Sequence, residues 1–568
     1  LRNVSARIWD FRDGETSSEL EPVHEFKAAG DHEVRLTIKT PPTESTGPVT
    51  ETRTITLKKD AGVAVGLLNF IYKDPADPAD PTKPTVSLSP WKPINANGPL
   101  DSVPIIRMAV YWGGFEPADN QFRDGYTPMP LSPKKSFTLV KQLQEMNELI
   151  EKEVTKRVVL TLRSTCSDLD KCWAFDTSVN NFDIQVSHPP KDLQSTYDAK
   201  TAYSPSYHDF VKHVVETIIH YGRIANIEGI VVENEMNSSE FFAGSVEQYS
   251  RMAATAKKAV QDALDDANLP RDSVPVYCGG HQGGASTWNL INEYFTLAKE
   301  DGQSQYKDIA LAFYNAAYPW DKYSIRNSKA TLEQKCTEQM TTKKPRAKTW
   351  TLQAFQSSLY GYDSEAPESP ILDGLNFHNY QGSGSIKPLV RDLYRKYTNQ
   401  SVVSNEMGIF VSMNQSNWHE HLRWEMVKKI ASSKFHVDRF IVWYSQNGKD
   451  DEKVHLGGMI DVNSFLLKDN VRTFRFLLDM IGQPELSKAD LSDGRPDGIR
   501  RYDFTYEGKI VRVVWSDGIS GYSEPVPESA SLYGIFGEPL QATDGKITLS
   551  PGAPIYIVWE PQATNEQN

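Results

Sequence analysis

Short apolar segments alternate with longer amphipathic segments through the middle of the chain, from about residue 62 to residue 480. The apolar segments are rich in Val, Ile, Leu and aromatic residues, a composition typical of buried strands. They cover residues 63–71, 104–112, 157–163, 228–234, 274–280, 372–378, 401–406 and 439–445. Several intervening segments carry apolar residues at helical spacing, among them residues 135–153, 206–222 and 246–264. Eight strands that alternate with helices predict a parallel sheet closed into a (β/α)8 TIM barrel, which we assign to residues 60–480.

Two features of this middle region depart from an even barrel pattern. No helical pattern is visible between the first two predicted strands. Residues 282–371, between the fifth and sixth strands, form a segment far longer than one helix and its loops require. We expect this long segment to build one wall of a cleft.

The two ends of the chain have the pattern of β-structure instead. Residues 1–59 show strand alternation, as in HEVRLTIKT and TRTITLKK, with turn residues between the strands. Residues 481–568 return to short strands and Gly, Asp and Pro turns, as in YDFTYEGKIVRVVWSDG. We therefore predict three domains, with a β-sandwich on each side of the barrel.

Composition limits the classes of partner. The net charge of −13 over 568 residues argues against nucleic acid or an anionic membrane surface as the main partner. No apolar run approaches the ~20 residues of a membrane span, and no signal peptide is visible at Leu1. Cys166 and Cys172 could close a small loop, Cys278 has the setting of a buried thiol, and no zinc-type spacing is present.

Polar residues gather where the predicted barrel strands end, the edge at which TIM barrels carry their functional groups. The fourth strand runs directly from an apolar stretch into Glu-Asn-Glu-Met-Asn at residues 233–237. The seventh strand ends in Glu406. The candidate residues at or beside strand ends are Arg107, Trp112, Asn234, Glu235, His281, His378, Tyr380, Glu406 and Trp443.

The first domain contains a recognisable motif. Residues 8–38 resemble a PKD domain, an immunoglobulin-like module with a W-D-F-G-D-G turn, although Arg12 stands where Gly is usual. The matching positions are Trp9, Asp10, Phe11, Asp13, Gly14, His24, Phe26, Gly30, Val34 and Leu36. The match begins late in the module, so we expect an N-terminally incomplete β-sandwich that serves as a spacer or accessory.

The order of motifs in the barrel resembles that of the clan A glycoside hydrolases, in particular families 30, 39 and 79. N-E-M-N at 234–237 is similar to their N-E-P motif, and S-N-E-M-G at 404–408 to their T-E-x-G motif. F-H-N-Y at 377–380 is similar to their sixth-strand segment, and V-W-Y at 442–444 to their eighth-strand segment. A β-sandwich after the barrel is also typical of these families.

This resemblance implies a role for each candidate. Glu235 would be the acid/base and Glu406 the nucleophile of a retaining mechanism, with Asn234 bound to the sugar 2-hydroxyl. His378, Tyr380 and Arg107 would orient Glu406, and Trp443 would lie beneath the sugar. His281 and Trp112 are further candidates for substrate contact.

Ordinary structural roles compete with several of these assignments. Glu235 and Glu406 could be exposed loop carboxylates, and Glu233 fits a structural ion pair better than it fits the acid. His281 and Arg107 could each be satisfied by neighbouring groups, and Trp112 could be part of the core.

The interpretation that follows is a secreted, periplasmic or cell-surface retaining glycosidase, with no cofactor and no metal, that cleaves β-linked polysaccharide inside the chain. The alternative is a non-catalytic glycan-binding protein on the same scaffold. An esterase is disfavoured because no G-x-S-x-G motif is present.

Overall fold

The computed structural model describes residues 6–11, 16–18, 32–39, 50–57, 64–68, 72–73, 86–87, 104–124, 157–166, 172–178, 183, 186–238, 241–300, 304–318, 328–341, 371–395, 400–409, 411–412, 418–444, 454–455, 470–482, 487–490, 498–506, 508–517 and 519–560. The chain divides into two compact units, Leu1–Ala61 and Gly62–Asn568.

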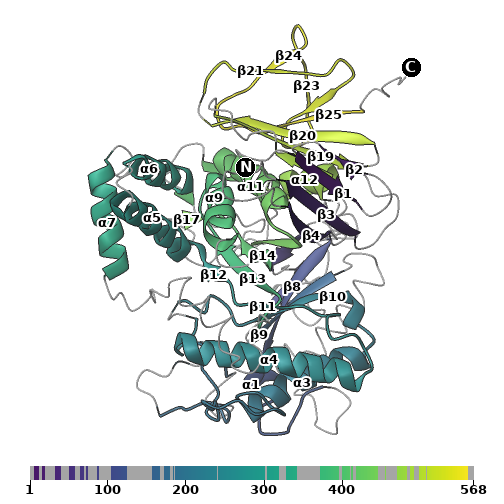
Figure 1. Cartoon of the computed structure of the whole chain (residues 1–568), viewed down its shortest axis with the longest axis vertical. Helices are drawn as coiled ribbons and strands as arrows, with labels where there is room; N and C mark the ends of the chain where they lie inside the picture. The colour runs from purple at the N-terminus through teal and green to yellow at the C-terminus, as the bar shows by residue number, and fades with distance from the viewer. Residues whose placement is uncertain are drawn as a thin grey trace. The chain divides into compact units, whose positions relative to one another are not determined.

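The second unit is built on a parallel sheet that is nearly closed into a barrel (Figure 1). Its strands, in chain order, are β5 (Ala64–Leu68), β8 (Ile105–Tyr111), β9 (Arg157–Arg163), β10 (Ile227–Val232), β11 (Val276–Cys278), β12 (His281–Gln282), β13 (Gly374–Asn379), β14 (Ser401–Met407) and β16 (Phe440–Tyr444). Strands that follow one another in the chain lie next to one another in the sheet. The last strand, β16, pairs with the first, β5, and β11 and β12 both pair with β13. All eight predicted strands are confirmed, β11 and β12 occupying one position, and the result is consistent with a TIM barrel.

Side chains alternate between the two faces of the barrel wall, as the pleat of a strand requires. One cluster contains residues of the barrel strands alone and fills the barrel interior. Its members are Ile105, Val159, Val231, Tyr277, Val403, Phe440 and Val442. Strand residues that face away from the barrel interior, such as Met108, Leu160 and Ile441, belong to a second and larger cluster shared with the surrounding helices.

The helices of the second unit cover the outside of this barrel. They are α1 (Trp112–Phe115), α3 (Pro205–His220), η2 (Ile224–Asn226), α4 (Val246–Asp266), α5 (Gly283–Glu300), α6 (Gln305–Ala317), α7 (Lys329–Thr341), η4 (Ser383–Ser385), α9 (Ile386–Pro388), η5 (Leu389–Tyr394), α11 (Trp418–His436) and α12 (Asn470–Ile481). The helices predicted at 206–222 and 246–264 are confirmed as α3 and α4, and the one predicted at 135–153 lies outside the described residues. The long segment 282–371 contains α5, α6 and α7, which explains its length.

Local sequence signals fix the starts of the two best-formed helices. Ser204 accepts a hydrogen bond from the Tyr207 backbone N–H, and Pro205 occupies the first helical position of α3. Ser245 and Gln248 form a reciprocal capping box at the start of α4.

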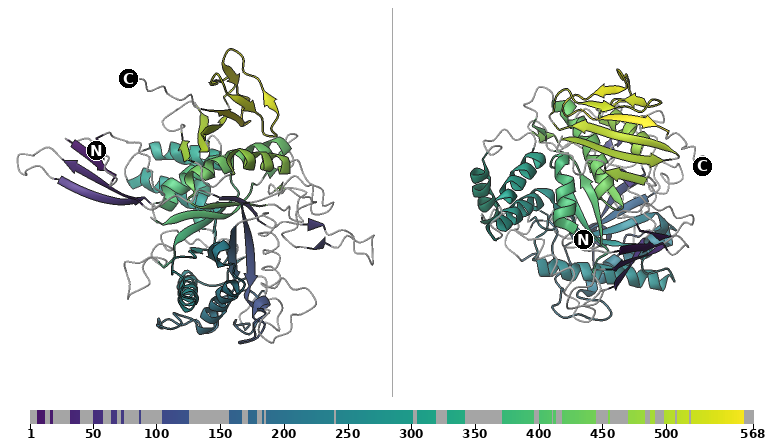
Figure 2. Two further views of the ribbon diagram at one scale, coloured as in Figure 1. Left: turned by 90° about the vertical axis from the view of Figure 1, so that its right-hand side faces the viewer. Right: turned by 45° about the horizontal axis from the view of Figure 1, so that its top comes forward.

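The C-terminal part of the second unit is antiparallel. Strands β18 (Ser487–Asp490), β19 (Ile499–Tyr506), β20 (Lys509–Ser516), β25 (Ile555–Trp559), β22 (Ser531–Tyr533) and β23 (Pro539–Leu540) form one sheet in that order. Strands β21 (Ser523–Pro525) and β24 (Lys546–Thr548) form a separate pair. One face of the larger sheet packs on the helices of the barrel, with the Tyr502 and Phe435 rings 5.9 Å apart (Figure 2). Its classification as a β-sandwich stays a prediction.

The first unit contains an antiparallel sheet in the order β2-β1-β3-β4. Its strands are β1 (Ala6–Asp10), β2 (Thr16–Ser17), β3 (His32–Lys39) and β4 (Thr50–Leu57), which confirms the strands predicted in HEVRLTIKT and TRTITLKK. Two short pairs, β6 (Tyr72–Lys73) with β7 (Val86–Ser87) and β15 (Val411–Ser412) with β17 (Val454–His455), belong to the second unit. The assignment of the first unit to a PKD-like module stays a prediction.

Two further sequence expectations can be compared with the structure. Cys166 and Cys172 form a disulfide across six residues, and Cys278 is a buried free thiol. Among the helices that the structure describes, none has the length and apolarity needed to cross a membrane.

Candidate active site

The chain leaves the end of β10 in an unusual backbone conformation. Glu233 has φ +71° and Glu235 has φ +32°, both in the left-handed region that residues other than glycine rarely adopt. Such a conformation costs ~1–3 kcal/mol per residue and persists only where the surrounding structure enforces it. Here it directs Asn234 toward Arg107 of β8 and Glu235 toward His378 of β13, while Glu233 pairs with Arg163 at 3.7 Å. The structural ion pair expected of Glu233 is confirmed.

The end of β14 is irregular in a different way. Between Ser404 and Met407, three steps along β14 match two steps along β16, from Ile441 to Trp443. The pairing of β14 with β13 shifts in the same region. This β-bulge cancels the strand alternation locally, so that Asn405 and Glu406, although adjacent, both direct their side chains to the barrel interior.

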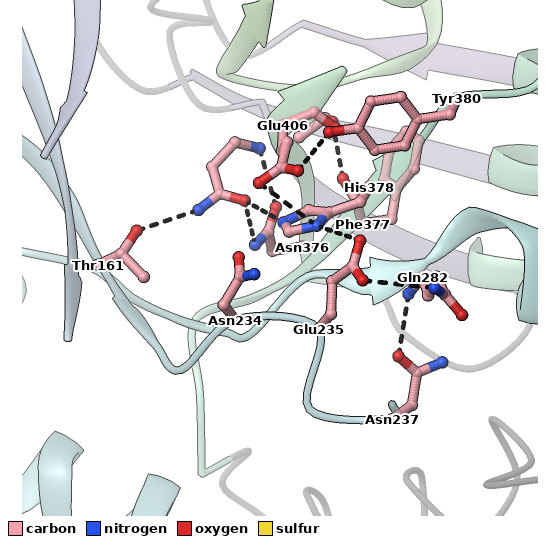
Figure 3. Close-up of polar contacts among 12 residues, drawn as sticks. Thr161, Asn234, Glu235, Asn237, Gln282, Asn376, Phe377, His378, Tyr380 and Glu406 are labelled. Atoms are coloured by element: carbon pink, nitrogen blue, oxygen red, sulfur yellow. Dashed lines mark hydrogen bonds and ion pairs between the residues drawn. The ribbon is translucent and has the colours of Figure 1, made fainter. Parts of the chain in front are cut away.

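The carboxyl groups of Glu235 and Glu406 both lie beside the imidazole ring of His378 (Figure 3). The His378 Nδ1 atom lies 3.0 Å from Glu235 Oε1 and 3.7 Å from Glu406 Oε2. One oxygen of each carboxylate and this ring nitrogen all lie within 4.8 Å of one another. Glu235 and His378 are buried, and Glu406 is 13% exposed, so the pair of carboxylates is shielded from solvent.

Positive charge and hydrogen bonds surround Glu406. Arg107 Nη1 donates to Glu406 Oε2 at 2.5 Å, and the Tyr380 hydroxyl donates to Glu406 Oε1. Burial alone would raise the pKa of Glu406, but the neighbouring His378, the Arg107 guanidinium and these hydrogen bonds outweigh it and lower the pKa below its ordinary value. Glu406 is therefore ionised at neutral pH. Burial and the two carboxylates raise the pKa of Tyr380, which keeps its hydroxyl protonated.

Glu235 experiences the opposite balance. Burial raises its pKa, the His378 contact lowers it, and the negative charge of Glu406 raises it again. The net shift is upward. Gln282 Nε2 lies 3.4 Å from the second oxygen of Glu235. Two neighbouring carboxyl groups whose pKa values move apart are the arrangement expected of an acid and a nucleophile.

Arg107 also orients Asn234. Its Nη2 atom donates to Asn234 Oδ1 at 2.7 Å, and its Nε atom donates to Thr161 Oγ1 at 2.9 Å. Because the oxygen of the Asn234 amide is held by Arg107, its Nδ2 group is the part left to donate to another partner. The structure thus brings together six of the nine predicted site residues: Arg107, Asn234, Glu235, His378, Tyr380 and Glu406.

Trp443 is a correction, because it lies on the other face of its strand. Val442 belongs to the barrel interior, whereas Trp443 is fully buried in the outer cluster with the helices. The residue of β16 that reaches the interior at this level is Tyr444, whose ring centroid lies 6.2 Å from that of Tyr380.

His281 and Trp112 are also corrections, because both side chains are buried in packing contacts. His281 is buried with its ring 6.4 Å from that of Tyr394 in η5, and burial lowers its pKa to about 3. Its neighbour Gln282 is the residue that reaches Glu235. Trp112 is fully buried, stacks on Phe210 at 5.1 Å and donates from Nε1 to Glu116, so it is part of the core.

Several polar residues of the site were not among the nine predicted ones. Asn376 and Asn405 are buried and hydrogen-bonded to each other, and Thr161 contacts both Arg107 and Asn405. The alternation of the strands contained the signal, because Asn376 lies two residues before His378 and Thr161 four residues after Arg157 on interior-facing positions. Asn405 could not be found this way, since it reaches the interior together with its neighbour Glu406.

Gly280 explains part of the glycine-rich sequence CGGHQGG. A Cβ atom at this position would lie 1.9 Å from His378 Nε2. Only glycine leaves room for the imidazole ring, so the glycine supports the site and is not a nucleotide-binding feature.

Glu235, His378 and Glu406 also satisfy the distances of a cation site, as no other group does in the part of the chain that the structure describes. The Arg107 guanidinium and the Tyr380 hydroxyl already occupy both oxygens of Glu406. A guanidinium at this position repels a second cation, and we do not assign these residues as metal ligands.

Comparisons with known proteins concern the fold. No protein-family model and no curated protein sequence matches the chain. A family 39 glycoside hydrolase from Bacteroides cellulosilyticus is 12% identical with a TM-score of 0.48, over 97% of this chain and 94% of that one. A family 30 endoxylanase from Clostridium papyrosolvens is 12% identical with a TM-score of 0.44, over 81% and 90%. A glucosidase from Croceicoccus marinus is 12% identical with a TM-score of 0.46, over 89% and 98%. Families 39 and 30 are two of those that the sequence resembles.

Proposed function

We propose that this protein is a retaining glycoside hydrolase that cleaves β-glycosidic bonds by double displacement. The observation that carries the proposal is the pair of shielded carboxylates, Glu235 and Glu406, which lie within 4.8 Å of each other and have pKa values shifted in opposite directions. Retaining glycosidases separate their two carboxyl groups by ~5–5.5 Å, whereas inverting enzymes need ~6.5–9.5 Å to admit a water molecule. The close approach of the two glutamates favours retention.

In the first step Glu235 donates its proton to the glycosidic oxygen as the bond to the anomeric carbon breaks. Glu406 attacks the anomeric carbon from the opposite side, and a covalent glycosyl-enzyme forms. The raised pKa of Glu235 favours the protonated form that this step requires, and the lowered pKa of Glu406 keeps the nucleophile ionised.

In the second step the Glu235 carboxylate removes a proton from water, which attacks the anomeric carbon and releases Glu406. Two inversions at one carbon restore the original configuration. Glu235 regains its proton, and the site returns to its starting state.

The neighbouring groups have defined parts in this chemistry. Arg107 and Tyr380 bind the two oxygens of Glu406 and so hold it in one orientation for attack. Asn234, fixed through its oxygen by Arg107, presents its Nδ2 group for the sugar 2-hydroxyl, a contact that strengthens in the transition state.

For the substrate we propose a β-linked polysaccharide that is cleaved inside the chain. The acidic composition disfavours densely sulfated or uronate-rich polymers. Polysaccharide substrates are found outside the cytoplasm, so we also propose a secreted, periplasmic or cell-surface location. We propose that the first unit is a PKD-like accessory domain.

The test is hydrolysis of a panel of β-linked polysaccharides, with the products sized and the first anomer formed identified by proton NMR. Early products of mixed size that keep the β-configuration support internal cleavage with retention. The α-anomer as the first product would contradict the mechanism.

The second candidate function is glycan binding without catalysis. Binding of a polysaccharide with no turnover of any polysaccharide or aryl glycoside would favour it. The pKa values of Glu235 and Glu406, which are shifted in opposite directions, argue against it, because a binding site gains nothing from two buried carboxyl groups of opposite proton affinity.

A further inference from the structure

His378 contacts both carboxylates through one ring nitrogen, so the position of the imidazole proton affects the catalytic pair. Nδ1 faces Glu235 and Glu406, while Nε2 faces Asn405 Oδ1 at 2.8 Å. A neutral imidazole carries its proton on one nitrogen only, and the hydrogen bond at the other nitrogen selects which one.

A chain of hydrogen bonds that starts at the backbone determines this proton. The Asn405 backbone N–H can only donate, and its partner at 3.0 Å is therefore the oxygen of the Asn376 amide. The other end of that amide, Asn376 Nδ2, is then a donor, and it faces the Asn405 side chain at 2.8 Å. The Asn405 atom that it meets must be the oxygen, which can only accept.

The consequence for His378 follows directly. Because Asn405 Oδ1 accepts, His378 Nε2 must carry a proton and donate. Neutral His378 then has a lone pair on Nδ1, and this lone pair faces Glu235 Oε1 at 3.0 Å. A lone pair opposite a carboxyl oxygen is stabilised only when a proton lies between them.

We propose that Asn405 is a positioning residue, which fixes the Nε2–H tautomer of His378 and thereby keeps the transferable proton on Glu235. The proposal deepens the proposed function and rests on it. When Glu235 has given its proton to the leaving group, its carboxylate faces the Nδ1 lone pair, and this repulsion favours removal of a proton from the attacking water. Asn405 thus acts on both steps through His378 without touching the substrate.

Other charged or titratable groups also face this pair. Glu406 lies 3.7 Å from His378 Nδ1, Arg107 is paired with Glu406, and Tyr380 donates to the same carboxylate. His281 is close enough to His378 to interact electrostatically with it. None of these side chains is replaced in Asn405→Asp, which changes the partner of Nε2.

The first test needs no substrate. Nitrogen NMR of histidine-labelled protein near neutral pH distinguishes the Nε2–H tautomer from the Nδ1–H tautomer and from imidazolium. The signals of His378 are identified by their loss in His378→Gln or, if that variant does not fold, by their shift in Asn405→Asp. We expect Nε2–H with an unprotonated Nδ1, and either of the other two forms in the native protein would overturn the proposal.

The second test compares Asn405→Asp with Thr161→Val. The introduced carboxylate accepts from His378 Nε2 but favours imidazolium, so that the proton moves from Glu235 Oε1 to His378 Nδ1 and leaves carboxylate and imidazolium. We expect the plateau of kcat/KM to fall, because less of the shared proton resides on Glu235, and the alkaline limb of the pH profile to move to higher pH, because the added negative charge holds that proton in the pair more tightly. Turnover of substrates with poor leaving groups should fall by at least about tenfold, and turnover of activated aryl glycosides much less.

Thr161→Val is the matched control, because it removes the contact of Asn405 Nδ2 at 3.3 Å and leaves Oδ1 and the tautomer in place. It also removes the Arg107 contact with Thr161, which affects the level of activity, but it should leave the alkaline limb where it is in the wild type. Equal displacement of the limb in both variants, or displacement in neither, would overturn the positioning role. Absence of any glycosidase activity in the wild type would instead overturn the proposed function, while the NMR result would still stand.

Discussion

The strand ends of this barrel fall into two groups that differ in regularity. The ends of β10 and β14 depart from strand geometry, one through left-handed residues and the other through a bulge. Strands β8 and β16 keep the alternation of a regular strand, with Arg107 and Tyr444 inside and Met108 and Trp443 in the outer core. The carboxylates of the site come from the irregular ends, and the groups that support them come mostly from regular ones.

This difference shows what backbone irregularity provides. A regular strand directs only every second side chain to the interior, whereas each irregular end directs two consecutive polar residues there. Asn234 and Glu235 form one such pair, and Asn405 and Glu406 form the other. The strained conformations are retained because packing in the rest of the barrel more than offsets their cost.

The largest effect is expected at the bulged end. Glu406→Gln removes the nucleophile while preserving volume, and we expect kcat to fall by about 10⁴-fold or more. The thermal unfolding temperature should change little, and circular dichroism should be that of the wild type. Near wild-type turnover in a folded variant would show that this irregular end is not catalytic.

The second-largest loss of activity is expected at the end of β10, where the backbone is left-handed. Glu235→Gln should lower turnover by about 10²–10⁴-fold on substrates with poor leaving groups, because these require protonation, and much less on activated aryl glycosides. Because Glu235 acts as an acid, activity is present while its carboxyl group is protonated and falls as the pH rises through its raised pKa. This alkaline limb should therefore be absent in the variant. Equal losses on both substrate classes would indicate a different acid.

The regular end of β16 allows a comparison of two adjacent aromatic residues. Trp443→Ala should destabilise the fold by about 3–5 kcal/mol, because a fully buried side chain leaves a cavity. At a temperature where the variant is folded, its kcat should stay near that of the wild type.

Tyr444→Ala should lower activity more than stability, the opposite of Trp443→Ala. We expect kcat/KM to fall by about tenfold through loss of an aromatic surface beside Tyr380, with a smaller loss of stability than Trp443→Ala. Measurement of both variants by thermal unfolding and steady-state kinetics tests which face of the strand serves the site. The reverse assignment of the two effects would show that the alternation is interpreted incorrectly.

The smallest effect on activity is expected from removal of the first unit, which contributes no strand to the barrel. Deletion of residues 1–59 removes the predicted PKD-like module and should leave hydrolysis of small soluble substrates within about twofold of the wild type. Its control is the unfolding temperature of the remaining unit. Unfolding of the barrel after the deletion would place the domain boundary elsewhere.

The sequence was sufficient to predict the barrel strands, and the two glutamates that it placed at strand ends lie close together in the structure. Apolar runs mark buried parallel strands, and the two carboxylates directly follow such runs. Two of the three wrong assignments, His281 and Trp443, are each next to the strand residue that reaches the site, Gln282 and Tyr444, whereas Trp112 begins helix α1 and packs in the core. A strand that is apolar on both faces does not reveal which face is inside, so its register could not be read from composition.

Asn405 could not be predicted for a different reason. Its position depends on the bulge in β14, which arises from pairing with β13 and β16, strands that are separate from it in the chain. No local pattern in S-N-E-M-G specifies that Asn405 and Glu406 share a face.

The central claim is that Glu406 is a nucleophile that becomes covalently bonded to the sugar. It is tested most directly by incubating the enzyme with activated 2-deoxy-2-fluoro glycosides, which form the glycosyl-enzyme but release it slowly, and by locating the label through mass spectrometry of the digested protein. The account predicts one added sugar, on the peptide that contains Glu406, and no labelling of Glu406→Gln. A label on Glu235 or on any other residue would contradict it.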